Sequence, residues 1–170
     1  MNAVLRLTKE QQQKGLTTHS SGNHAQAIAL AAKAVGTTAY IVMPSNAPKI
    51  KKRGVEALGG KIIECEPTLA AREKGVEKVI AETGATFIHP FDNDDVISGQ
   101  ATTAKELIED YGNFDVIMAP VGGGGLLSGT ALACHYLSPE TEVWAGEPEG
   151  AADAILSFES GKVEKAPYIN

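Results

Sequence analysis

Apolar segments rich in β-branched residues alternate in this sequence with alanine-rich segments of helical spacing. The extended segments cover residues 38–44, 61–65, 86–90, 116–121 and 143–146. The helical segments cover residues 25–35, 49–58, 69–82, 99–110 and 126–136. Strands that alternate with helices of this length are typical of parallel sheets with helices on their faces. The sequence therefore predicts an α/β fold of three layers, in which helices flank parallel strands.

Glycine residues mark the ends of the predicted helices. Gly36, Gly59, Gly84 and Gly112 each follow a helical segment, where a C-terminal cap favours positive φ. The two ends of the sequence lack such signals. Residues 1–7 are similar to the middle of an apolar helix without an N-cap, and residues 151–170 contain no obvious closing element. We therefore expect a chain that is cut at both ends.

Composition and charge exclude several classes of protein. Of the 170 residues, 43% are hydrophobic and 21% are charged, as in ordinary soluble globular proteins. The formal net charge of -6 argues against a nucleic-acid partner. The first residues do not show the pattern of a secretory signal, and we expect no apolar run of membrane-spanning length. Cys65 and Cys134 show neither a disulfide pattern nor metal-ligand spacing. We expect a soluble, cytoplasmic protein with no membrane partner.

Small polar residues precede the first alanine-rich helix. The motif is Thr18-His-Ser-Ser-Gly-Asn-His-Ala-Gln26. At a helix start, such residues leave backbone N–H groups and partial positive charge available to a carboxylate or phosphate. A plain N-cap explains the same pattern and, on spacing alone, is the more common case.

Four consecutive glycines, Gly122, Gly123, Gly124 and Gly125, join a predicted strand to a predicted helix. Such a run weakens the chain unless the backbone must approach something closely. After a strand of a parallel sheet, successive N–H groups favour a phosphate over a merely flexible turn. No Gly-Lys-Ser/Thr follows, which excludes a nucleoside-triphosphate loop.

Two further patterns are weaker. Gly123-x-Gly125-x-x-Ser128, followed by Glu147, approximates a dinucleotide fingerprint, although Ser128 replaces its third glycine. Glu147 and Asp153, with a backbone carbonyl between them, could hold a hard cation, whereas a solvated acidic loop explains the same pattern and, on spacing alone, is the more common case. The remaining candidates are three histidines without metal or catalytic spacing, which we interpret as structural: His19, His89 and His135.

Taken in order, the motifs resemble the fold-type II pyridoxal-phosphate (PLP) enzymes, which share the tryptophan synthase β-like fold. The likeness is closest to the branch of serine racemase and serine/threonine dehydratase (threonine ammonia-lyase). The matching pieces span nearly the whole chain at residues 18–26, 39–44, 47–52, 88–90, 97–100, 121–125 and 145–148. The resemblance implies residues 1–92 of the small domain and residues 93–170 of the PLP-binding domain.

The resemblance also implies a role for each motif. The loop Gly122 to Gly125 would hold the PLP phosphate, and Asn23 would also contact the 3′-oxygen of the cofactor. The substrate carboxylate would be bound by Ser20, Ser21, Gly22, Asn23 and His24. Ser21 would be the catalytic residue that gives or takes the α-proton in a racemase. Mg²⁺ or Ca²⁺ would be bound by Glu147, the carbonyl of Ala151, and Asp153.

One family motif is missing from the sequence. The family's Ser-Phe-Lys-x-Arg-Gly-Ala segment carries the lysine to which PLP is attached, and none of the lysines here lies in such a segment. We therefore expect a portion of a PLP-dependent lyase or isomerase of amino-acid metabolism that acts on serine or threonine. Its activity as an enzyme stays open, as does its partner, a second copy in a homo-oligomer (dimer) or a chain with the missing half. The alternatives are a catalytically dead remnant that binds PLP or an amino acid, and a dinucleotide-binding module.

Overall fold

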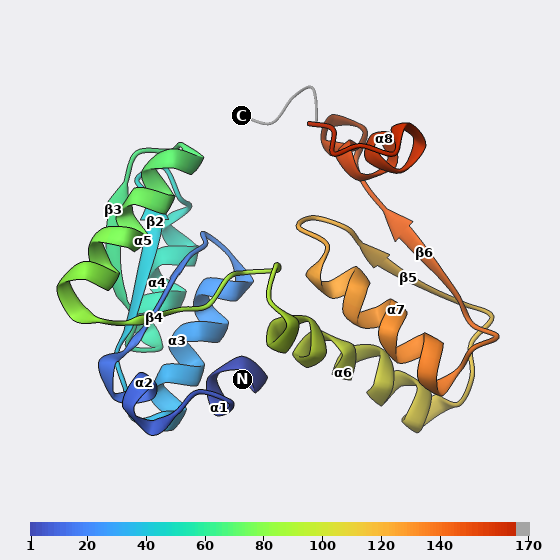
Figure 1. Cartoon of the computed structure of the whole chain (residues 1–170), viewed down its shortest axis with the longest axis horizontal. Helices are drawn as coiled ribbons and strands as arrows, with labels where there is room; N and C mark the ends of the chain where they lie inside the picture. The colour runs from blue at the N-terminus through green and yellow to red at the C-terminus, as the bar shows by residue number, and fades with distance from the viewer. Residues whose placement is uncertain (166–170) are drawn as a thin grey trace. The chain divides into compact units, whose positions relative to one another are not determined.

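The computed structural model describes residues 1–165 of the chain (Figure 1). The chain divides into two compact units, Met1–Val96 and Ile97–Asn170, which are described separately below. Among the described residues, no helix has both the length and the apolar character needed to cross a bilayer.

The first unit is built on a four-stranded parallel sheet with the strand order β3-β2-β1-β4. Its strands are β1 (Leu16–His19), β2 (Ala39–Pro44), β3 (Lys61–Cys65) and β4 (Thr86–Phe87). Its helices are α1 (Asn2–Leu5), α2 (Lys9–Lys14), α3 (Asn23–Val35), α4 (Lys49–Ala57) and α5 (Leu69–Thr83). The predicted α/β fold with parallel strands and flanking helices is confirmed.

Both faces of this sheet are covered, as the period-two alternation of side chains requires. Ile41 and Met43 point to one face, where they pack with alanines of α3 and with Val55 of α4. Val42 points to the opposite face and packs with Val76 and Val79 of α5. The small alanine side chains of α3 let this helix lie close to the strands, and three layers result.

Several elements differ from the sequence-based expectations. The strand β1, at the centre of the sheet, was not predicted, because Leu16-Thr-Thr-His19 is short and polar. The segment predicted to be extended over residues 86–90 pairs only at Thr86 and Phe87. Gly36, Gly59, Gly84 and Gly112 have positive φ, which confirms the predicted caps.

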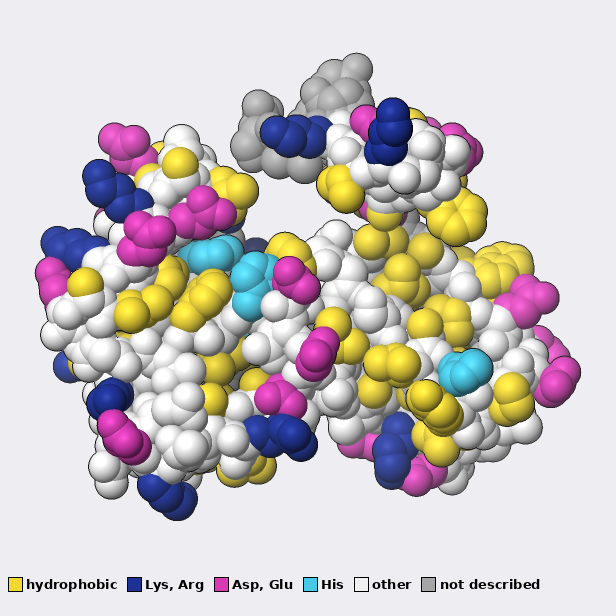
Figure 2. All heavy atoms as spheres, in the orientation of Figure 1, with side chains coloured by type: hydrophobic (Ala, Val, Ile, Leu, Met, Phe, Trp, Pro, Cys, Tyr) yellow, Lys and Arg dark blue, Asp and Glu magenta, His cyan; other side chains and the backbone are white. Residues whose placement is uncertain are grey.

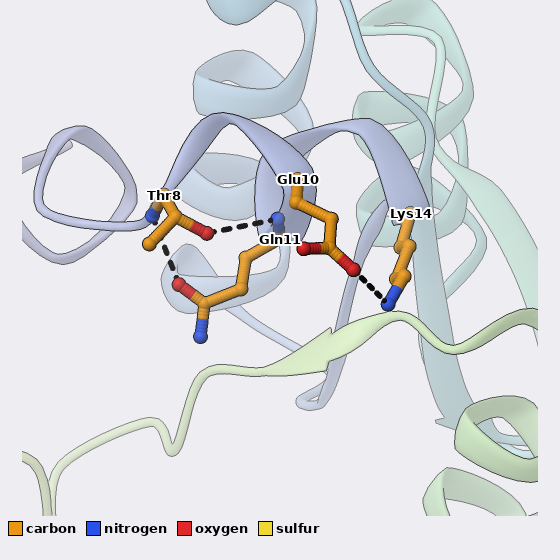
Figure 3. A network of polar contacts seen from close by, with 4 residues as sticks. All are labelled: Thr8, Glu10, Gln11 and Lys14. Atoms are coloured by element: carbon orange, nitrogen blue, oxygen red, sulfur yellow. Dashed lines mark hydrogen bonds and ion pairs between the residues drawn. The ribbon is translucent and has the colours of Figure 1, made fainter.

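The N-terminal residues do not form one long apolar helix. α1 is a single turn, and α2 starts anew at Thr8 with a reciprocal capping box (Figure 3). The backbone N–H of Gln11 donates to the Thr8 hydroxyl, and the N–H of Thr8 donates to the Gln11 side chain. Lys14 adds an ion pair with Glu10 one turn earlier, which lowers the pKa of the Glu10 carboxyl. The capping box at Thr8 is a local sequence signal for a helix start, and the sequence analysis missed it.

Aromatic and imidazole rings gather where β1 and β4 end. The ring of His19 lies 5.5 Å from Phe87 and 5.8 Å from His89, and His89 lies edge-on to Phe91 at 4.5 Å. Figure 2 shows histidine side chains next to hydrophobic ones on this unit. Burial lowers the pKa of His19, and the charges of His89 and Arg72 add to this effect. Burial thus favours the neutral form of the His19 ring.

The second unit contains a parallel pair of strands, β5 (Val116–Pro120) and β6 (Glu142–Gly146). Its helices are α6 (Asp94–Tyr111), which begins at the end of the first unit, α7 (Gly125–Leu137) and α8 (Asp153–Ser160), with a 3₁₀ turn at Glu149–Ala151. Ile117 and Val143 pack against α6 and α7. On the other face, Met118 is 64% exposed and Trp144 is 51% exposed. Among the described residues, only one face of this pair is covered.

The packing of α7 on α6 depends on Gly129. A Cβ at this position would lie 2.6 Å from the backbone N of Ala101 and 2.7 Å from the carbonyl O of Ile97. Both atoms belong to the α6 backbone, which cannot move aside as a flexible side chain could. The contact therefore admits only glycine, although glycine is a poor helix former.

Gly129→Ala tests this contact against helix propensity. Propensity alone favours alanine by ~1 kcal/mol, whereas forcing a methyl into a filled space costs ~1–3 kcal/mol or more. We expect the variant to unfold at a lower urea concentration than the wild type, as followed by far-UV circular dichroism. Gly150→Ala is the matched control, because no atom lies within 4 Å of its Cβ position and its φ is not positive. A Gly129→Ala variant as stable as the wild type would contradict the close contact.

The lowered pKa values of His19 and His24 predict a dependence of stability on pH. Burial is the main cause for both residues. Below the ordinary histidine pKa of about 6.5, the unfolded chain binds protons that the folded chain does not. The contribution to stability is thus complete above about pH 6.5 and is lost as the pH falls below it. We expect a lower urea midpoint at pH 5.5 than at pH 7.5, and a smaller difference in His19→Gln. Equal midpoints in the wild type at both pH values would refute this assignment.

Candidate active site

The Ser20–His24 loop is the junction between β1 and α3. The N–H of Ser20 donates to the Val42 carbonyl, which continues the ladder between β1 and β2 by one residue. The N–H of Gly22 then donates to the Ser20 hydroxyl at 3.3 Å, and α3 begins at Asn23. The predicted strand-to-helix junction at this motif is confirmed.

This loop presents backbone donors without acceptors. No acceptor is found within residues 1–165 for the N–H groups of Ser21, Asn23, His24 and Ala25, and no side chain caps α3. The unpaired N–H groups of a helix start carry partial positive charge. The loop can therefore bind an anion through its backbone, as the carboxylate assignment requires. The plain N-cap interpretation lacks the capping hydrogen bond that would support it.

The imidazole of His24 is engaged elsewhere. Its Nε2 lies 3.2 Å from the carbonyl O of Ile88, and because a carbonyl only accepts, Nε2 carries the proton. Burial lowers the pKa of His24, partly opposed by this hydrogen bond. The neutral ring thus ties the loop to the chain that follows β4. Any contribution of His24 to an anion site therefore comes from its backbone N–H. The Ser21 hydroxyl and the side-chain amide of the exposed Asn23 have no hydrogen-bond partner among the described residues.

Two cations at the same edge of the sheet were missed by the sequence analysis. Arg72 lies in the first turn of α5, and its Nε is buried without a hydrogen-bond partner. Its charge acts on both His19 and Cys65, which places it near the ends of β1 and β3. Lys51 lies in the first turn of α4, with its Nζ 3.9 Å from the position of a Cβ on Gly22. The available signal was their position in the first turn of a helix that follows a strand. This position points to a shared site only once the order of the strands in the sheet is known.

The glycine loop is the junction between β5 and α7. The N–H of Val121 donates to the Gly146 carbonyl, so that the ladder with β6 extends to the loop. A turn follows in which the N–H of Gly124 donates to the Val121 carbonyl at 2.8 Å, and α7 begins at Gly125. This strand-to-helix junction, too, is confirmed.

The geometry of this loop fits a phosphate group. Gly122 and Gly124 have φ of 52° and 89°, a region that residues with a side chain seldom adopt, and no atom lies within 4 Å of their Cβ positions. Among the described residues, no acceptor is found for the N–H groups of Gly122, Gly123, Gly125, Leu126 and Leu127. Space and unpaired donors thus occur together where a PLP phosphate would be held.

The acidic segment has a different local role. Both carboxylate oxygens of Glu147 accept backbone N–H groups at the start of α8, from Ala154 at 3.3 Å and Ile155 at 3.0 Å. Ile155 would otherwise be the natural donor to the Ala151 carbonyl, for which no donor is found within residues 1–165. Asp153 is the first residue of α8. No group of three or more acidic, histidine or cysteine side chains that could hold a metal occurs among the described residues.

Comparison with known proteins agrees with this arrangement. The chain is 49% identical over 169 residues to serine racemase of Arabidopsis thaliana, covering 99% of the chain and 51% of that protein. It is 49% identical over 162 residues to beta-hydroxyaspartate dehydratase of Paracoccus denitrificans, covering 95% of the chain and 51% of that protein. The structure of maize serine racemase matches with a TM-score of 0.96 and 45% identity, covering 99% of the chain and 51% of that structure.

The chain thus spans about half the length of the curated relatives it matches. The dinucleotide-binding alternative is not favoured by these relatives. The family model for the pyridoxal-phosphate dependent enzymes matches residues 1–169. The chain belongs to this family of pyridoxal-phosphate dependent enzymes.

Proposed function

We propose that this protein takes part in the PLP-dependent dehydration or racemisation of small hydroxy amino acids. The observation that carries the proposal is the pair of strand-to-helix junctions at Ser20–His24 and Gly122–Gly125, each with backbone donors that lack acceptors. Relatives at 49% identity are named as serine racemase and as beta-hydroxyaspartate dehydratase, and both reactions begin with removal of the α-proton of an amino acid.

The glycine loop is assigned to the phosphate of PLP. Its N–H groups, together with the start of α7, would stabilise a negative group through the partial positive charge of the backbone. The left-handed glycines allow the backbone to curve around the phosphate where a side chain would interfere. When bound, PLP supplies the electron sink that lets the α-proton of the amino acid leave.

The Ser20–His24 loop is assigned to the substrate carboxylate. Its N–H groups would fix the carboxylate, and this orientation directs the bond to the α-hydrogen, an effect worth several orders of magnitude in rate. The Ser21 hydroxyl, free of partners among residues 1–165, is assigned the gain or loss of the α-proton on its side. Asn23, whose amide is exposed, is assigned to the 3′-oxygen of the cofactor.

We also propose that a divalent cation, Mg²⁺ or Ca²⁺, binds at Glu147, the Ala151 carbonyl and Asp153. The Ala151 carbonyl, for which no donor is found within residues 1–165, and the carboxylates of Glu147 and Asp153 are oxygen ligands of the kind that such hard cations prefer. Cys65 and Cys134 are free thiols, which suits a reducing cytoplasm.

The exposed side chains Met118 and Trp144 suit pairing with a second copy or with a chain that supplies the family's lysine segment.

Arg72 supports a second candidate substrate besides serine and threonine. A guanidinium with a buried, unpaired Nε at the carboxyl edge of the sheet is suited to a second carboxylate, because guanidinium and carboxylate pair through charge-assisted hydrogen bonds. No ion pair of Arg72 occurs among the described residues. The dehydratase relative is named for beta-hydroxyaspartate, which carries such a carboxylate on its side chain. We propose 3-hydroxyaspartate as the second candidate substrate.

Gly124→Ala tests the phosphate assignment. Alanine in the left-handed region costs ~1–2 kcal/mol, and relieving this strain turns the N–H groups away from the phosphate. We expect at least a tenfold weaker binding of PLP, measured by absorbance and fluorescence titration. Gly112→Ala is the matched control, with a φ of 85° and no atom within 4 Å of its Cβ position, but at the end of α6. Equal loss of PLP affinity in both variants would mean that strain alone is responsible.

Arg72→Met separates the candidate substrates. Dehydration of 3-hydroxyaspartate gives oxaloacetate and ammonia, whereas serine gives pyruvate and ammonia, so ammonia release measures both. In the mixture of this chain with a polypeptide that carries the Ser-Phe-Lys segment, removing the cation should lower kcat/KM for 3-hydroxyaspartate at least tenfold and leave the value for serine nearly unchanged. Lys74→Met, an exposed position on the same helix, is the control. An equal loss with both substrates would contradict the role in selection.

The activity assay is run on the 170-residue chain alone and mixed with a polypeptide that carries the Ser-Phe-Lys segment. Because none of the chain's lysines lies in that motif, the mixture is expected to be active and the single chain is not. Turnover by the single chain at the level of the mixture would show that one of its own lysines takes this role.

A further inference from the structure

We infer that Lys51 is the charged part of the carboxylate site, a positioning residue that pairs with the α-carboxylate held by the Ser20–His24 loop. The inference rests on the proposed function and adds to it a side chain from a different helix. The loop itself offers only backbone N–H groups and neutral side chains, since the imidazole of His24 is bound to the Ile88 carbonyl.

The sheet brings Lys51 to the loop. β1 and β2 are parallel neighbours, with Leu16 to His19 in register with Ala39 to Val42, so both strands end at the same edge. α3 starts after β1, and α4 starts after β2. Lys51 is the third residue of α4, and its Nζ lies 3.9 Å from the position of a Cβ on Gly22. Glycine at position 22 leaves the space between the ammonium and the loop free.

The other nearby lysine of this helix has a structural partner, and Lys51 has none. Lys52 donates to the Ser45 carbonyl at 2.9 Å and pairs with Glu64 of β3. No acidic partner of Lys51 occurs among residues 1–165, where the ion pairs involve other residues. Its ammonium therefore lies beside the start of α3, which carries partial positive charge. No described group of the fold neutralises this positive charge, and a bound anion would stabilise it.

A carboxylate at the loop meets the requirements of both groups. It would accept hydrogen bonds from the N–H groups of the loop and one charge-assisted bond from Lys51. Because the lysine is exposed, its contribution depends on salt, whereas the backbone N–H groups fix direction. The ammonium thus strengthens binding of the carboxylate, and the loop orients it.

The test compares Lys51→Gln with Lys49→Gln, an exposed lysine two residues earlier on the same helix without an ion pair among the described residues. The PLP-loaded protein is titrated with L-serine and with L-serine methyl ester, which lacks the carboxylate charge. Binding is followed through the NMR shifts of the Gly22, Asn23 and His24 amides. Thermal melts of the variants check that the fold is retained.

We expect Lys51→Gln to bind serine about three- to tenfold more weakly, to lose much of the salt dependence of binding, and to bind the ester as the wild type does. Lys51→Arg should restore most of the affinity for serine, and Lys49→Gln should behave as the wild type. Unchanged serine affinity in Lys51→Gln, or an equal loss for serine and ester, overturns the role of Lys51, as does a wild type that binds no serine. Failure of the wild type to bind PLP would instead overturn the proposed function.

Discussion

The parallel pairing of β1 with β2 and β4 is the interaction on which the first unit depends. Hydrogen bonds on both sides of Leu16 and Thr17 fix β1 at the centre of the sheet, and all four strands end at one edge. The helices α3, α4 and α5 follow β1, β2 and β3 and begin at that edge, so that residues far apart in the sequence are brought to it. The loop after β1, the lysine after β2 and the arginine after β3 lie at the same edge because of this pairing.

Much of the fold could be read from the sequence, because the alternation of apolar and alanine-rich segments is a local signal. The glycine loop was identified for the same reason, because four glycines between a strand and a helix favour a close backbone approach over a flexible turn. β1 was missed because its polar composition does not predict a strand. Its central position in the sheet determines that it forms one, and no local sequence pattern reports this position. The start of α6 at Asp94 was also missed, since residues before Gly99 lack the alanine-rich spacing.

The candidate site was predictable only where it is made of backbone. The Ser20–His24 and Gly122–Gly125 junctions follow from small residues at helix starts, and both lie where the sequence placed them. Lys51 and Arg72 could not be found this way, because lysine and arginine are common on exposed helices and nothing in α4 or α5 marks one as special. Their positions become informative only after the order β3-β2-β1 is known. In an acidic chain of net charge -6, they place two cations at this edge.

The cap that Glu147 provides to α8 ties this helix to the strand before it. The carboxylate belongs to the residue directly after β6, yet it accepts the N–H groups of Ala154 and Ile155. The stability of the first turn of α8 therefore depends on the pairing of β5 with β6 and not on the helix propensity of its own residues. Opening of β6 away from β5 should release both amides at once, so that strand and helix exchange their hydrogens as one cooperative unit. α8 is a short helix of marginal stability by itself, and it should stay folded for as long as the paired strands β5 and β6 hold its cap in place.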